Sequence, residues 1–175
     1  MLIGEKAAAV APLEELKGFL RIEDGTEDAL LAGMLRAATE AVEAWLGWLL
    51  IAREVTERTE IVQAAVLLRA TPVQSLGSVA LVDAGDTSPI ADVRLQVSRF
   101  GVGKVALTGV CDGMQVIVRY RAGLADDWNG LPEPVRLGVL RAAAHFYAHR
   151  DGGEGGGLPP AVARLVSPWR VKRMR

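Results

Sequence analysis

The sequence is poor in the residues that most often form covalent braces and reactive sites. Its 175 residues include one cysteine, Cys111, and two histidines, His145 and His149, and only 5% of the chain is aromatic. A single thiol excludes a disulfide within the chain and is typical of a protein made in a reducing compartment. A disulfide-braced secreted domain is therefore excluded, and few residues remain that could form a metal or nucleophilic site.

Long hydrophobic runs are also missing. The longest candidate, WLGWLLIA, is far shorter than the roughly 20 apolar residues that a membrane-spanning helix needs. The opening MLIGEKAAAVAPLEE lacks the charged start and the apolar run of a secretion signal. We therefore expect a soluble protein with no membrane partner that is intracellular when it is made.

Acidic residues are absent after Glu154, so the net charge of −1 conceals an uneven distribution. Eleven acidic and five basic residues lie between Leu13 and Glu60, whereas five basic and no acidic residues lie between Gly155 and Arg175. Opposite charge at the two ends favours either contact between successive copies or binding of the C-terminal end to an acidic partner.

Periodicity predicts an α+β fold that begins with a helical pair. Apolar residues recur at helical spacing from Leu30 to Leu46, and Gly47 is expected to end that helix. Asp24 and Glu27 resemble a capping box at its start. The predicted helices cover about residues 12–20, 27–46 and 134–149.

The middle of the chain predicts a small antiparallel β region. Short segments rich in Val, Ile and Thr alternate with turn signals between about residues 53 and 121, which indicates one sheet of five or six strands. Val116, Val118 and Tyr120 are expected to share one face of the last strand.

The chain is expected to consist of a body at 1–151 and a C-terminal extension at 152–175. The segment GGEGGG is typical of a flexible linker, and PAVARLV predicts a short helix that Pro168 ends, followed by an extended tail. The predicted hinge residues are Gly152, Gly153, Gly155, Gly156 and Gly157.

Two patterns could indicate chemistry, and neither is complete. RFGVGKVAL lacks the first glycine, the Ser or Thr after the lysine, and the following helix of a phosphate-binding loop, so a hairpin turn is favoured. HFYAH places two histidines four residues apart but lacks the glutamate and a third ligand. We therefore predict no enzyme activity, no catalytic residue, no metal and no cofactor.

The basic end of the chain carries Trp169, Val171 and Met174 among its cations. A terminus that is only solvated has no use for these side chains, and Trp and Arg are common anchors of protein interfaces. A protein-docking tail is therefore favoured. The alternative is a nucleic-acid-binding accessory protein that uses the same basic tail, although the acidic body does not provide the usual basic face.

Four segments resemble the head–tail connector, or adaptor, proteins of long-tailed bacteriophages and of phage-like gene transfer agents. They are LEELKGFLRIEDGTEDALLAGMLRAATEAVEAWLGWLL, TPVQSLGSVALVD, VRYRAGLADDWNGLPEPVRLGVLRAAAHFYAHRDG and LPPAVARLVSPWRVKRMR. The resemblance covers both ends of the chain, whereas the strands between residues 83 and 114 carry no signature of that family.

The resemblance implies a virion structural protein at the head–tail junction. Similar proteins form a ring, usually of twelve copies, that joins the portal to a stopper or tail-completion protein and surrounds the channel for DNA ejection. The DNA would pass without sequence-specific binding. By the same resemblance, the portal-binding residues would be Trp169, Arg170, Val171, Lys172, Arg173, Met174 and Arg175.

The acidic N-terminal half has a possible role in such a ring. A channel wall that repels phosphates lets DNA slide, because charge neutralisation is what makes proteins hold DNA. We therefore expect Glu40 and Glu43 as possible channel-lining residues.

Overall fold

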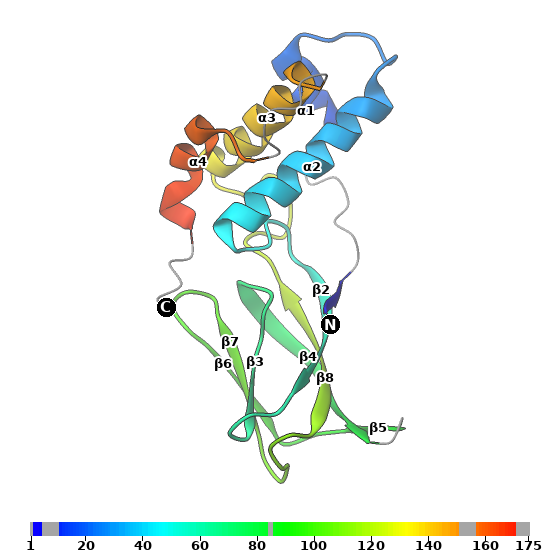
Figure 1. The fold of residues 1–175 in the computed structure, drawn as a ribbon, viewed down its shortest axis with the longest axis vertical. Helices are drawn as coiled ribbons and strands as arrows, with labels where there is room; N and C mark the ends of the chain where they lie inside the picture. The colour runs from blue at the N-terminus through cyan, green and yellow to red at the C-terminus, as the bar shows by residue number, and fades with distance from the viewer. Residues whose placement is uncertain (1, 5–10, 84–85, 151–156, 171–175) are drawn as a thin grey trace. The chain divides into compact units, whose positions relative to one another are not determined.

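A computed structural model of the chain describes residues 2–4, 11–83, 86–150 and 157–170 (Figure 1). It contains helices and antiparallel sheets, which confirms the α+β class. The described residues form two compact units, a helical unit within residues 7–51 and 125–175 and a β unit within residues 1–6 and 52–124. None of the described helices is both long and apolar enough to cross a membrane.

The helical unit contains helices from both ends of the chain. Its helices are α1 (Leu13–Leu20), α2 (Asp28–Leu46), α3 (Glu133–Ala148), α4 (Pro160–Val166) and the short 3₁₀ turn η1 (Ser167–Trp169). α3 packs against α1, α2 and α4, and Figure 1 shows α2 and α3 lying side by side. The three long predicted helices are confirmed with bounds that differ by one residue.

The buried stripe of α2 explains why this helix forms where the sequence predicts it. Leu31, Leu35 and Val42 are fully buried at helical spacing. Gly47 follows the helix with a φ of 75°, and its N–H donates to the carbonyl of Glu43 at 2.8 Å. This left-handed conformation favours glycine and ends the helix as predicted.

The predicted capping box is wrong. Asp24 accepts a hydrogen bond from the backbone N–H of Thr26 at 3.0 Å, and no side chain caps the start of α2. Glu27 instead accepts a hydrogen bond from the hydroxyl of Tyr147 and lies 3.5 Å from the guanidinium of Arg150. Its carboxylate therefore joins the start of α2 to the end of α3.

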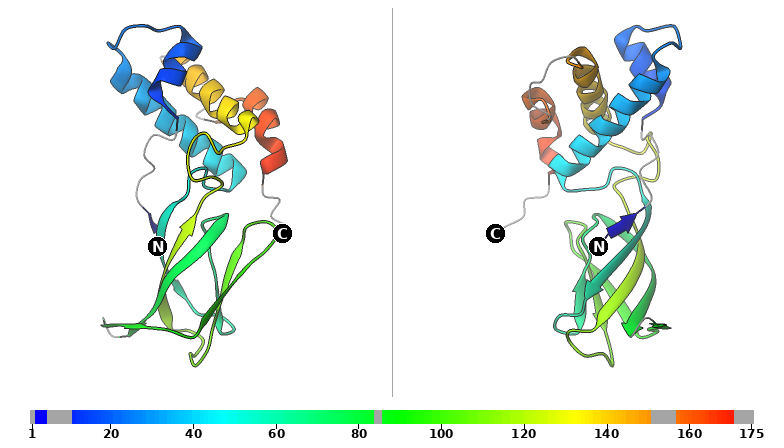
Figure 2. Two further views of the ribbon diagram at one scale, coloured as in Figure 1. Left: turned by 180° about the vertical axis from the view of Figure 1, so that it is seen from behind. Right: turned by 45° about the vertical axis from the view of Figure 1, so that its right-hand side comes forward.

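The β unit contains two antiparallel sheets rather than the single sheet that the sequence predicts (Figure 2). In the described residues the five-stranded sheet has the order β1-β2-β8-β4-β5, and the three-stranded sheet has the order β3-β7-β6. The strands are β1 (Leu2–Gly4), β2 (Arg53–Glu60), β3 (Ala65–Leu67), β4 (Val73–Asp83), β5 (Asp86–Pro89), β6 (Val93–Val97), β7 (Gly103–Leu107) and β8 (Gln115–Ala122).

The core of the β unit consists of alternate residues on its strands. Val116, Val118 and Tyr120 of β8 are fully buried, which confirms that they share one face. Val105 of β7 is also fully buried, while its neighbour Lys104 is exposed. Each of these strands thus presents one apolar and one solvated face.

A buried carboxylate links the strands of this unit. Glu57 is fully buried, and its Oε2 accepts hydrogen bonds from the hydroxyl of Tyr120 at 2.9 Å and from the N–H of Arg69 at 3.1 Å. The Arg69 guanidinium lies 3.2 Å from its other oxygen, and the Tyr120 hydroxyl accepts the N–H of Ala70 at 3.0 Å. Burial raises the pKa of Tyr120, so its hydroxyl stays protonated and can donate.

The turn between β2 and β3 is held by a distant aspartate. Gln63 and Ala64 have φ angles of 54° and 52°, a left-handed conformation that costs a non-glycine residue roughly 1 kcal/mol. The carboxylate of Asp112 accepts their backbone N–H groups at 3.0 and 2.9 Å. The bond from Ala64, followed by the bond from Gln63, lowers the pKa of Asp112.

The lowered pKa of Asp112 predicts a pH-dependent contribution to stability. The carboxylate stabilises the fold above its ordinary pKa, and this contribution is lost as the pH falls through the lower pKa of the folded state. Asp112→Asn should therefore be less stable than wild type near neutral pH, with a difference that narrows below about pH 4. Urea unfolding near pH 7 and near pH 3 measures the free energy of unfolding of both chains. The same difference between the two chains at both pH values would contradict the prediction.

Candidate functional site

The C-terminal segment begins with a helix that packs closely on α3. Val162 and Val166 of α4 are buried. A Cβ atom added at Gly138 of α3 would lie 2.6 Å from Cγ1 of Val166, closer than side chains can approach. Gly138 therefore lets α4 lie against α3, and the predicted short helix is confirmed as part of the helical unit.

The chain continues from α4 into η1, which also belongs to the helical unit. The hydroxyl of Ser167 donates to the carbonyl of Arg164 at 2.9 Å, and the N–H of Arg170 donates to the carbonyl of Ser167 at 3.1 Å. The guanidinium of Arg170 lies 4.1 Å from the ring centroid of Trp45, in the last turn of α2. We call Ser167–Arg170 the C-terminal root.

The root contains two of the seven residues predicted to bind the portal. Trp169 is half-buried, whereas Arg170 is exposed and stacked on Trp45. The other five, Val171, Lys172, Arg173, Met174 and Arg175, lie outside the described residues. Contacts within the chain itself therefore fix the positions of Trp169 and Arg170, the two described residues of the predicted site.

The predicted hinge lies mostly outside the described residues. Gly152, Gly153, Gly155 and Gly156 are not described, and Gly157 is exposed, with no atom within 4 Å of a Cβ built on it. The expected division between 1–151 and 152–175 therefore stays a prediction.

The two glutamates predicted to line a channel differ in their surroundings. Glu40 is exposed on α2. Glu43 is half-buried, and its Oε1 accepts the backbone N–H of Leu50 at 2.8 Å. Glu43 therefore holds the chain after α2, whereas the carboxylate of Glu40 faces solvent.

The segment that resembles a phosphate-binding loop forms the turn between β6 and β7, as the sequence analysis favours. The Ser98 hydroxyl accepts the N–H groups of Phe100 and Val102 at 3.3 and 3.2 Å. Gly101 has a φ of 72°, and a Cβ there would lie 2.4 Å from Cβ of Pro72. The turn and the close packing on Pro72 both require a glycine here. Its presence is therefore explained without a phosphate-binding role.

The two histidines stack on each other. Their ring centroids are 4.1 Å apart, and Nδ1 of His149 lies 2.8 Å from the carbonyl oxygen of His145. In the part of the chain that the structure describes, no group of three or more potential metal ligands occurs. This arrangement uses both side chains for local packing at the end of α3.

The contact between Arg170 and Trp45 is not evident from the sequence, because 125 residues separate them and the helical stripe assigns Trp45 to the core. The only signal is the presence of an aromatic residue near the end of α2 and an arginine beside Trp169. Pairing them requires the fold, which brings the last turn of α2 next to the end of α4.

Removing the guanidinium of Arg170 should loosen the root. A cation–π contact at an exposed site contributes about 0.5–1 kcal/mol, so Arg170→Ala should speed amide exchange in α4 and η1 by about two- to five-fold. The matched control is Arg164→Ala, an exposed arginine on α4. Unchanged exchange in Arg170→Ala, or an equal increase in both variants, would contradict this role.

Comparison with known proteins identifies relatives of the whole chain. It is similar to a chain in the neck of an empty GTA particle computed with C6 symmetry, with a TM-score of 0.83, 28% identity, and coverage of 100% of this chain and 97% of that chain. A chain in the virion of a native gene transfer agent (GTA) particle gives a TM-score of 0.82 at 28% identity, with the same coverage.

A third similar chain belongs to the neck of a native GTA particle computed with C12 symmetry. Its TM-score is 0.78 at 26% identity, with 99% of this chain and 97% of that chain covered. No curated protein matches the sequence. The sequence model of the family described as head completion protein matches residues 10–154, most of the chain. The chain therefore belongs to the head completion protein family, which confirms the resemblance found in its sequence.

Proposed function

We propose that the protein is a subunit of a ring at the neck of a phage-like particle, where it joins the portal to a stopper or tail-completion protein. The observation that carries this proposal is the near-complete similarity to chains in GTA necks, at 28% identity and with 97% of the relative's length covered. A ring of twelve copies is compatible with both symmetries, C6 and C12, that are named for the similar necks. The proposed role is structural, and DNA would pass through the ring.

The C-terminal root supports a role for the following residues in portal docking. Val162 and Val166 are buried, and Arg170 is stacked on Trp45, so the described C-terminal end has a defined place on the helical unit. Residues 171–175 follow this fixed point directly in the sequence, and they would form the docking segment.

Weak docking of each single copy is enough for strong binding when the copies are joined in a ring. Each docked segment raises the effective concentration of the next one, so avidity can exceed the affinity of a single segment by about 10²–10⁴-fold. Val171 and Met174 would supply the apolar contacts, and Lys172, Arg173 and Arg175 would pair with acidic groups of the portal. Trp169 and Arg170 would hold these five residues in position.

Deleting residues 171–175 tests the docking proposal. The shortened chain keeps the root, so it should fold and have the wild-type stability, but it should no longer co-purify with the portal protein. A variant with Lys172, Arg173 and Arg175 replaced by Gln should retain part of the binding and lose its salt dependence. Wild-type recovery of the portal with the shortened chain would contradict the proposal. Binding of naked DNA, lost in the same variants, would favour the nucleic-acid alternative.

The proposed channel role of the acidic half is tested best at Glu40. Its side chain is exposed, so Glu40→Gln should leave the fold intact, whereas a change at Glu43 would also remove the bond to Leu50. If Glu40 lines the channel, the neutral variant repels phosphates less and DNA ejection should slow. Ejection from particles carrying Glu14→Gln, an exposed glutamate of α1, is the control. An unchanged rate for Glu40→Gln in intact particles would refute this placement.

A further inference from the structure

An apolar groove crosses the helical unit between α1 and α4. Leu137 and Leu140 of α3 line it together with Leu165 of α4 and Glu15 of α1, and its volume is about 310 Å³. We call this the α3 groove. Glu133, whose side chain is 82% exposed, and Arg136 also line it, and the Arg136 guanidinium lies 3.1 Å from the Glu133 carboxylate. The groove is at the small end of the range for ligand sites, so it suits one or two protein side chains better than a cofactor.

The α1 wall of this groove is fixed by contacts of Glu15. Its carboxylate accepts the Nε1–H of Trp128 at 2.9 Å and lies 3.7 Å from the guanidinium of Arg136. Phe19 follows Glu15 by four residues, so both lie on the same face of α1, and Phe19 is 46% exposed.

The β unit carries an exposed aromatic side chain that is suited to an apolar groove. Phe100 lies at the turn between β6 and β7 and is 54% exposed, and Val97 at the end of β6 is 46% exposed. We call Val97–Val102 the Phe100 tip. The Ser98 hydrogen bonds and the contact of Gly101 with Pro72 fix its backbone, so the ring is held out in solvent with little entropy left to lose on binding.

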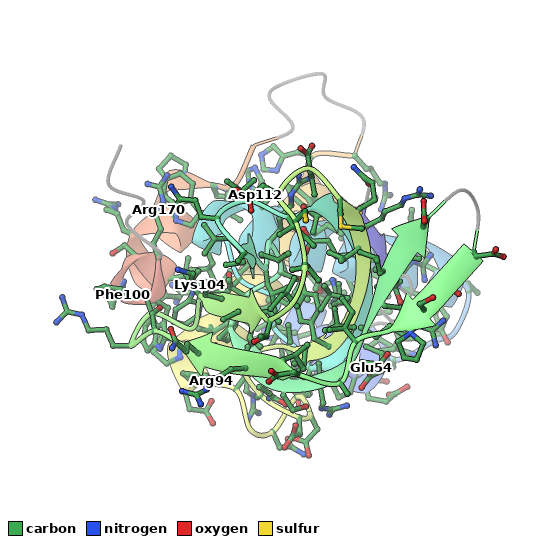
Figure 3. All side chains as sticks on the ribbon, turned by 90° about the horizontal axis from the view of Figure 1, so that it is seen from below. Glu54, Arg94, Phe100, Lys104, Asp112 and Arg170 are labelled. Carbon is green, nitrogen blue, oxygen red and sulfur yellow. The ribbon has the colours of Figure 1, made fainter. Side chains whose placement is uncertain are left out.

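The tip is also cationic. The guanidinium of Arg99 lies 4.6 Å from the ring centroid of Phe100. Arg94 of β6 and Lys104 of β7 are exposed on the same hairpin, where Figure 3 labels them with Phe100. Register explains their shared face, because Gln96 pairs with Lys104 and lies two residues from Arg94. An aromatic ring beside an arginine is a common anchor of protein interfaces.

We propose that the Phe100 tip of one copy inserts into the α3 groove of a second copy. Phe100 would contact Leu137 and Leu140, and Arg99 would share the exposed carboxylate of Glu133 with Arg136. The two surfaces differ, so the contact is heterologous and each copy offers one surface to each neighbour, as a ring requires. The proposal rests on the ring function above and specifies which surfaces join its subunits.

Disulfide trapping in purified particles tests this contact. In a Cys111→Ser background, a chain with Phe100→Cys and Leu137→Cys should give a ladder of linked copies on a non-reducing gel. The matched control pairs Leu67→Cys with Leu137→Cys, because Leu67 is 66% exposed in the β unit but lies outside the tip. A ladder for the first pair alone supports the proposal. No ladder from particles that contain the double-cysteine chain, or an equal ladder from the control, overturns it.

Charge reversal gives a second readout that does not need cysteines. Arg99→Glu and Glu133→Lys should each reduce incorporation of the chain into particles by about ten-fold, and the double variant should restore it, because 1.4 kcal/mol of lost coupling is a factor of ten. Normal incorporation of both single variants, or no recovery in the double variant, overturns the contact. Absence of the wild-type chain from particles would instead refute the ring function itself.

Discussion

The close packing of α4 on α3 is the contact on which the arrangement of the C-terminal end depends. Val166 packs against α3 in this position only because Gly138 has no side chain, since a methyl group there would lie 2.6 Å from Val166. This contact places η1 next to the end of α2, where Arg170 can stack on Trp45. These contacts hold α4 and η1 on the helical unit and fix the position of Arg170.

The β unit consists of many short strands, and two carboxylates help to hold these strands in one register. The buried Glu57 accepts bonds from β8 and from the segment after β3, and Asp112 binds the turn between β2 and β3. Burying a carboxylate costs free energy that hydrogen bonds and an opposite charge must offset, so the bonds to Oε2 of Glu57 and the Arg69 guanidinium near Oε1 favour one arrangement over alternatives. The rigid Phe100 tip depends on the same unit for its position.

Local patterns predicted the helices well and the β region less well. The stripe of α2, its end at Gly47 and the buried face of β8 follow from spacing and from the conformational freedom of glycine, which are visible in the sequence. The separation of β3, β6 and β7 into a second sheet is not visible, because pairing between distant strands depends on tertiary packing. The capping box failed for a related reason, since Glu27 makes its bonds to Tyr147 and Arg150 rather than to its own helix.

The family could be predicted from the sequence, whereas the geometry of the C-terminal root could not, and the docking residues stay a prediction. The basic, Trp-containing end and the family resemblance pointed to a docking segment, and the family is confirmed. The sequence could not show that Arg170 binds within its own chain, because nothing in the local pattern pairs it with Trp45. It also could not show the α3 groove, which three separate helices line.

Electron microscopy of particles that contain this chain tests the central claim most directly. The account predicts a ring of copies at the neck, with α4 packed on α3 in each copy and residues 171–175 in contact with the portal. Density that places the chain outside the neck, or that shows α4 detached from α3 with the C-terminal end away from the portal, would contradict it.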